Sequence, residues 1–204
     1  MRRARPLQAF MLGVLLLFTP VFALWYWLAG FHLAPVVAVT GTLVDLLCPD
    51  ALMWLRLDGH TLVLASNFGH DAAGQVVSPP TGDDLLGFHL NPLIYCYSLP
   101  LLAALTLAVP GPDRGLNLLW GVLLLFPVEV FSMVFSVLKT LTFDVGAAFQ
   151  LQQGITPLGA DLIALGYQAG VLILPMVAPL VIWIALHRRF IITLAPRLEQ
   201  VLST

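Results

Sequence analysis

The stretch Leu7–Gly30, LQAFMLGVLLLFTPVFALWYWLAG, contains no charged side chain. About 20 apolar residues in a helix are enough to cross a hydrocarbon core of about 30 Å. Arg2, Arg3 and Arg5 precede the stretch, as in a secretory signal. However, the stretch is longer than a typical signal core, and no clean small-residue cleavage site follows it. It therefore predicts a retained membrane anchor.

Three further apolar runs of about 19 to 25 residues follow along the chain. They are Asn91–Val109, Leu116–Leu138 and Leu162–Leu186, and the turn Pro110-Gly111-Pro112 separates the first two. The 204 residues are 59% hydrophobic and only 10% charged, whereas soluble domains carry about 25% charged residues. We predict an all-α membrane protein, a four-transmembrane-helix bundle forming one integral domain over residues 1–204, with spans at about 7–30, 91–109, 116–138 and 162–186.

The positive charges are distributed unevenly around these runs. Of nine Lys and Arg residues, only Arg56 and Lys139 fall on one side of the four-span pattern. Because cytoplasmic loops are enriched in Lys and Arg, we expect both termini in the cytoplasm of a bacterial cell, residues 31–90 outside it, and the chain in the inner (plasma) membrane. The other seven Lys and Arg residues fall on the opposite, cytoplasmic side of the four-span pattern: Arg2, Arg3, Arg5, Arg114, Arg188, Arg189 and Arg197. The net charge of -2 gives no reason to expect a nucleic-acid partner.

Leu33–Leu47 is also apolar, but it contains Pro35 and Asp45 and is short for a span. We expect it to be a separate helix that lies in the outer interface. If it crossed the membrane instead, every later loop would change sides and the charge asymmetry would weaken.

Residues 49–90 are the only sizeable polar stretch. Apolar residues on both sides of Asp58-Gly59 predict a tight β-hairpin, residues 69–84 read as a loop, and Leu85–Leu90 could add a third strand. No His-x-x-x-His or comparable ligand spacing is present, so we expect neither a metal nor a cofactor. The histidines and aspartates of this stretch are His60, His70, His89, Asp58, Asp71, Asp83 and Asp84.

Polar residues recur inside the third run at helical spacing. Glu129, Ser132, Ser136 and Lys139 are 3, 4 and 3 residues apart and share one helix face. A carboxylate near mid-membrane costs roughly 2.5–3.5 kcal/mol and must face the interior of the bundle. The stripe is either hydrogen-bonding glue between helices or the floor of an outward-facing cleft with Lys139 at its rim.

Two other helix ends offer polar residues to such a cleft. Asn91 and Tyr95 fall on one side of the second run, and Asp161, Tyr167 and Gln168 lie at the start of the fourth. All five belong to the same predicted membrane face.

Cys96 is the plausible nucleophile of this face, because a helix N-terminus and a nearby cation favour a reactive thiolate. The alternatives are a buried, inert thiol and a disulfide with Cys48, which is also predicted to be extracytoplasmic.

Three short motifs resemble the exosortase H-associated membrane proteins of bacteria. They are Phe22-Ala-Leu-Trp-Tyr-Trp, Asn91-Pro-Leu-Ile-Tyr and Ala164-Leu-Gly-Tyr-Gln. This resemblance implies an accessory protein that binds an exosortase, or the C-terminal sorting helix of its substrates, within the membrane. Gly166 and Gly170 form a Gly-x-x-x-Gly motif that could contact such a partner.

A weaker resemblance extends to exosortases themselves. Cys96 matches their catalytic cysteine in placement, Lys139 stands where an Arg belongs, and Tyr167 or Gln168 stands where a His belongs. Lys lacks the bidentate fork of Arg, and neither Tyr nor Gln is a good base near pH 7. The resemblance implies an exosortase-like scaffold without catalytic activity of its own; the alternative is a membrane thiol transpeptidase or peptidase that uses Cys96 with Lys139.

Overall fold

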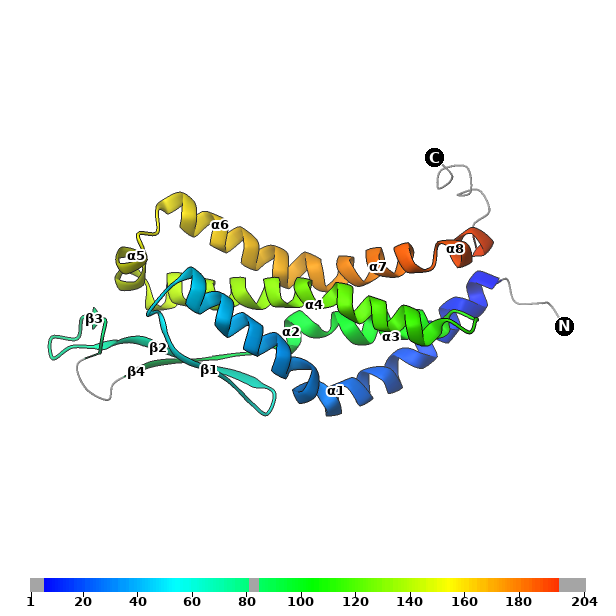
Figure 1. Cartoon of the computed structure of the whole chain (residues 1–204), viewed down its shortest axis with the longest axis horizontal. Coiled ribbons are helices and arrows are strands. Elements are labelled where there is room, and N and C mark those ends of the chain that lie inside the picture. Colours follow the sequence, from blue (N-terminus) through cyan, green and yellow to red (C-terminus); the bar gives the residue numbers. More distant parts are fainter. Residues whose placement is uncertain (1–5, 81–84, 195–204) are drawn as a thin grey trace. The chain divides into compact units, whose positions relative to one another are not determined.

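The computed structural model describes residues 6–80 and 85–194. Within these residues, three helical segments are long and apolar enough to cross a membrane: Leu7–Leu47, Arg114–Val145 and Pro157–Leu186. A shorter apolar helical segment covers Leu93–Ala108. The chain is therefore a mostly helical protein with a small sheet (Figure 1). Six residues used in the sequence predictions lie outside the described ranges: Arg2, Arg3, Arg5, Asp83, Asp84 and Arg197.

The first helix, α1, runs without interruption over Pro6–Leu47. The prediction that a span ends at Gly30 and a separate interfacial helix begins at Leu33 is therefore wrong. Gly and Pro cost a helix about 1 and 3 kcal/mol. Without water, however, each unpaired backbone group costs several kcal/mol, so interrupting the helix would cost more. The 42 residues correspond to about 63 Å of helix.

The second apolar segment consists of α2 (Leu93–Cys96) and α3 (Ser98–Ala108). Asn91 caps its start, because its Oδ1 accepts a hydrogen bond from the Leu93 backbone N–H at 3.1 Å. The Pro-Gly-Pro turn follows α3, as predicted.

The third segment begins with α4 (Arg114–Lys139), which contains Pro127, and continues as a π-helix, η1 (Thr140–Val145). Gly146, with φ of 82°, ends it and leads into α5 (Ala147–Gln153). A positive φ of this size favours glycine, so the sequence specifies this corner locally.

The fourth segment combines α6 (Pro157–Gln168), a π-helix η2 (Ala169–Ile173) and α7 (Leu174–Leu186). Thr156 caps α6, accepting a hydrogen bond from the Gly159 N–H. The short helix α8 (Arg188–Leu194) follows α7.

The sheet contains the hairpin predicted around Asp58-Gly59. Strand β1 (Leu52–Asp58) pairs antiparallel with β2 (Thr61–His70), and Asp58 faces Thr61 across the turn. Gly59 has φ of 58°, the conformation that such a two-residue turn requires. The predicted third strand is β4 (Leu85–Leu90), which pairs with β2 as Figure 1 shows. A two-residue strand, β3 (Val76–Val77), interrupts the predicted loop 69–84.

The chain divides into two compact units. Unit 1 takes its residues from Met1–Trp27, Tyr97–Phe126 and Met176–Thr204, and unit 2 from Leu28–Cys96 and Pro127–Pro175. The core of unit 1 is apolar: Phe10 stacks on Trp183 with ring centroids 5.3 Å apart. Its other buried members are Leu102, Leu105, Val109 and Leu125.

Unit 2 combines the sheet with α2, α5 and α6 and with parts of α1 and α4. Leu33, Val36, Thr40 and Val44 are completely buried, so one face of α1 packs inward along the segment that we expected to be interfacial. Phe68 of β2 meets Phe149 of α5 edge-on. Unit 2 also holds most of the polar residues that the sequence singled out.

Candidate functional site

A partly buried hydrogen bond joins α1 and α4 in unit 2. His32 Nε2 lies 2.7 Å from Glu129 Oε2, and the Glu129 side chain is 2% exposed. A carboxyl group in an apolar helix must find such a partner inside the protein, and this pair shows how the chain accommodates Glu129.

A second buried contact joins α2 and α4. The Tyr95 hydroxyl lies 2.7 Å from Ser136 Oγ, and both residues are buried. Tyr167 of α6 lies close enough to interact with the Tyr95 hydroxyl. Three helices therefore contribute side chains to this contact.

The predicted polar face of α4 is confirmed for three of its four members. Glu129, Ser132 and Ser136 are each 1% exposed. Ser132 Oγ donates to the Val128 carbonyl, within its own helix, at 2.9 Å. The stripe is therefore an inward face of α4.

Lys139 is oriented differently. Its ammonium group contacts both carboxylate oxygens of Asp144, at 3.1 and 3.0 Å, and its side chain is 33% exposed. This ion pair links Lys139, the last residue of α4, to Asp144 of η1.

The two glycines of the Gly-x-x-x-Gly motif pack inside unit 2. A Cβ at Gly166 would overlap the Phe135 ring, and one at Gly170 would lie 3.0 Å from Ser132 Cα. The motif therefore brings the fourth segment against α4. The expectation that these glycines contact a partner is wrong, because the chain's own helix occupies their surface.

Both cysteines are free thiols in this structure. Cys96 is completely buried and Cys48 is 7% exposed. Burial raises the pKa of the Cys48 thiol above its usual value, so the group stays protonated at neutral pH.

The remaining predicted residues lie at the surface. Asn91, Asp161 and Gln168 are exposed, and Asn91 serves as the cap of α2. Two cavities of unit 2, of about 570 and 230 Å³, are lined by residues other than the polar ones discussed above. Among the described residues, no group of three His, Cys, Asp or Glu side chains is placed to hold a metal ion.

His32 was missed in the sequence analysis. The available signal was its position: it is an ionisable residue within a long apolar helix, and such residues are usually paired. Its partner, Glu129, is 97 residues away, and no spacing rule links the two.

The polar contacts described above join α1, α2, α4 and α6. Of these helices, α1, α4 and α6 belong to segments long and apolar enough to cross a bilayer. These are the features of an α-helical membrane protein. The chain belongs to the exosortase H-associated membrane protein family, whose model matches residues 4–190. The family resemblance inferred from the three motifs is thereby confirmed. No curated protein and no solved structure matches the chain.

Proposed function

We propose that this protein is a non-catalytic accessory subunit of an exosortase-type protein-sorting system, in which it binds the exosortase or the sorting helix of a substrate. Membership of a family described as exosortase H-associated carries the proposal. The lipid bilayer surrounds the long helices, because these expose apolar side chains along their length.

The environment of Cys96 favours binding over catalysis. A nucleophile must be reached by its substrate and needs a base within hydrogen-bond distance, yet Cys96 is completely buried. The two other candidates are engaged elsewhere, with Lys139 on Asp144 and Tyr167 beside Tyr95.

The outward side of α6 and η2 is the surface we propose for the partner helix. Another side of this segment packs on α4 through the two glycines. The side chains on the outward surface are apolar and more than half exposed: Leu158, Leu162, Leu165, Leu172 and Ile173. Helices in a membrane associate by close packing of such surfaces.

Site-specific photocrosslinking in the native host tests this assignment. A photoreactive residue at Leu165 or Leu172 is expected to give adducts with the exosortase. The same residue at Leu16, which is equally exposed but lies on α1, serves as the matched control and is expected to give fewer adducts.

A strain without the exosortase identifies the partner. Adducts that disappear in this strain come from the exosortase, whereas adducts with sorting substrates that persist indicate binding of the sorting helix. If all three positions crosslink only to lipid, the proposed surface is wrong.

The catalytic alternative has its own test. We expect Cys96→Ala to leave sorting of substrates unchanged, provided that the variant accumulates to the wild-type level. Loss of sorting at normal abundance would establish a catalytic thiol and overturn the non-catalytic assignment.

A further inference from the structure

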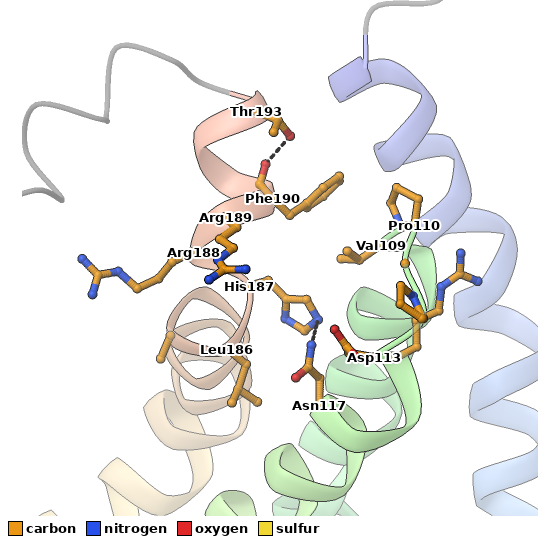
Figure 2. Close-up of a pocket in the computed structure, with 14 residues that line it drawn as sticks. Val109, Pro110, Asp113, Asn117, Leu186, His187, Arg188, Arg189, Phe190 and Thr193 are labelled. Atoms are coloured by element: carbon orange, nitrogen blue, oxygen red, sulfur yellow. Dashed lines mark hydrogen bonds between the residues drawn. The ribbon is translucent and has the colours of Figure 1, made fainter.

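Unit 1 contains a cavity of about 610 Å³ near the ends of two apolar segments (Figure 2). Its walls come from four parts of unit 1: the turn after α3, the first turn of α4, the last residues of α7, and α8. The membrane-compatible segments end at Leu186 and begin at Arg114. The cavity is therefore at the level where a bilayer changes from hydrocarbon to headgroups.

The cavity is rich in positive charge. Arg114, Arg188 and Arg189 line it, opposed by Asp113. In Figure 2, Arg189 lies beside His187, whereas Arg188 extends away from the His187–Asn117 pair. The cavity also meets the N-terminal end of the 26-residue helix α4, where free backbone N–H groups and the helix dipole favour an anion.

The inner wall carries two neutral polar groups. His187 is 5% exposed, and its Nδ1 lies 3.1 Å from the Trp183 carbonyl, which places the proton on Nδ1. Its Nε2 faces the Asn117 amide nitrogen at 3.4 Å. Burial lowers the pKa of His187, so the ring is neutral at pH 7 and accepts from the Asn117 amide.

Most of the remaining lining is apolar. Val109, Leu186 and Phe190 border the cavity next to the charged groups. A small inorganic anion would gain nothing from these side chains. A phospholipid would place its phosphate near the arginines and its glycerol and first methylene groups against the apolar wall.

We propose that this cavity binds the phosphate of an anionic phospholipid headgroup, with Arg114 and Arg189 as its main ligands. Basic pockets between membrane helices recognise anionic headgroups in this way. Arg is suited to the role because its planar fork donates two hydrogen bonds to a phosphate.

Native mass spectrometry of the full-length protein, released from detergent with added lipid, tests the proposal. Phosphatidylglycerol is the probe and phosphatidylcholine the zwitterionic control. A charged hydrogen bond contributes about 1.5–3 kcal/mol, so we expect Arg114→Gln and Arg189→Gln each to weaken phosphatidylglycerol binding by about tenfold or more. Arg56→Gln, a change in β1 outside the cavity, is the matched control and leaves binding unchanged.

Asp113→Asn supplies a test in the opposite direction. Removing the opposing carboxylate is expected to strengthen phosphatidylglycerol binding, which a generally damaged protein would not do. Thermal melting of each variant in detergent shows that its fold is intact. If Arg114→Gln does not fold, Arg114→Lys, which keeps the charge but loses the fork, is expected to give intermediate affinity.

Three results would overturn the proposal. The first is equal binding of phosphatidylglycerol and phosphatidylcholine, and the second is an equal loss of affinity in Arg56→Gln. The third is that millimolar inorganic phosphate saturates the cavity and the protein shows no preference for the lipid. That result would make the cavity a site for a small anion.

Discussion

His32 and Glu129 depend on each other energetically. Removing one partner of a buried hydrogen-bonded pair leaves the other group unsatisfied and costs about 1–3 kcal/mol, or more where that group is ionised, whereas replacing both with apolar residues can be nearly neutral. The 2.7 Å contact and the nearly complete burial of Glu129 put this pair in that class. We therefore expect His32→Leu to lower the melting temperature sharply, and His32→Leu/Glu129→Leu to recover most of the loss. Thermal melting in one detergent provides the measurement. Additive losses in the double variant would show that the two residues are not coupled.

The two thiols allow a second test at the residue scale. Cys96 is completely buried and Cys48 nearly so, and a raised pKa further reduces the thiolate of Cys48 at pH 7. We expect a membrane-permeant maleimide to label both slowly in the folded protein and rapidly after denaturation in SDS. Single Cys→Ala variants assign the signal to each thiol. Rapid labelling of Cys96 in the folded state would indicate an accessible site and would favour the catalytic alternative.

Among the elements, the contact between the fourth segment and α4 depends on Gly166 and Gly170. At Gly170 an added Cβ would lie 3.0 Å from the Ser132 backbone, so the helices must move apart. Overpacking of this kind costs about 1–3 kcal/mol. Gly30, inside α1, has no atom within 4 Å of such a Cβ, and Ala there gains about 1 kcal/mol of helix propensity. Gly170→Ala is therefore expected to lower the melting temperature and Gly30→Ala to maintain or raise it. If both substitutions change the melting temperature in the same direction, close packing does not hold these helices together.

The same elements show which features the sequence specifies. The hairpin was predictable because Asp58-Gly59 is a local signal that its neighbours reinforce. The inward face of α4 was predictable because helix geometry alone places Glu129, Ser132 and Ser136 together. The continuity of α1 was not, since it depends on the cost of unpaired backbone groups without water. Nor was the pairing of His32 with Glu129, which tertiary contact alone creates.

For the whole molecule, the distribution of positive charge depends on how many times the chain crosses the membrane. The segment Leu93–Ala108 is about 24 Å long as a helix, somewhat less than a hydrocarbon core. A short span is tolerated at a fraction of a kcal/mol per Å through local thinning of the bilayer. If it crosses, seven of the nine Lys and Arg residues share one side. If it does not, the split is four (Arg2, Arg3, Arg5, Lys139) to five (the rest), and the charge bias that normally orients membrane proteins disappears.

We therefore propose four crossings, with both termini in the cytoplasm and the sheet outside, and reporter insertions test this arrangement. Gly74, Gly111 and Gly154 lie in turns with positive φ between the segments, and the C-terminus provides a fourth position. Alkaline phosphatase is active only where disulfides form, so it should be active at Gly74 and Gly154, with a cytoplasmic fluorescent reporter bright at Gly111 and at the C-terminus. With three crossings, the results at Gly111, at Gly154 and at the C-terminus would all be reversed. Gly74 would report the same side in both cases and serves as the internal control. Activity at Gly111 would also place the proposed lipid cavity, which contains that residue, in the outer leaflet.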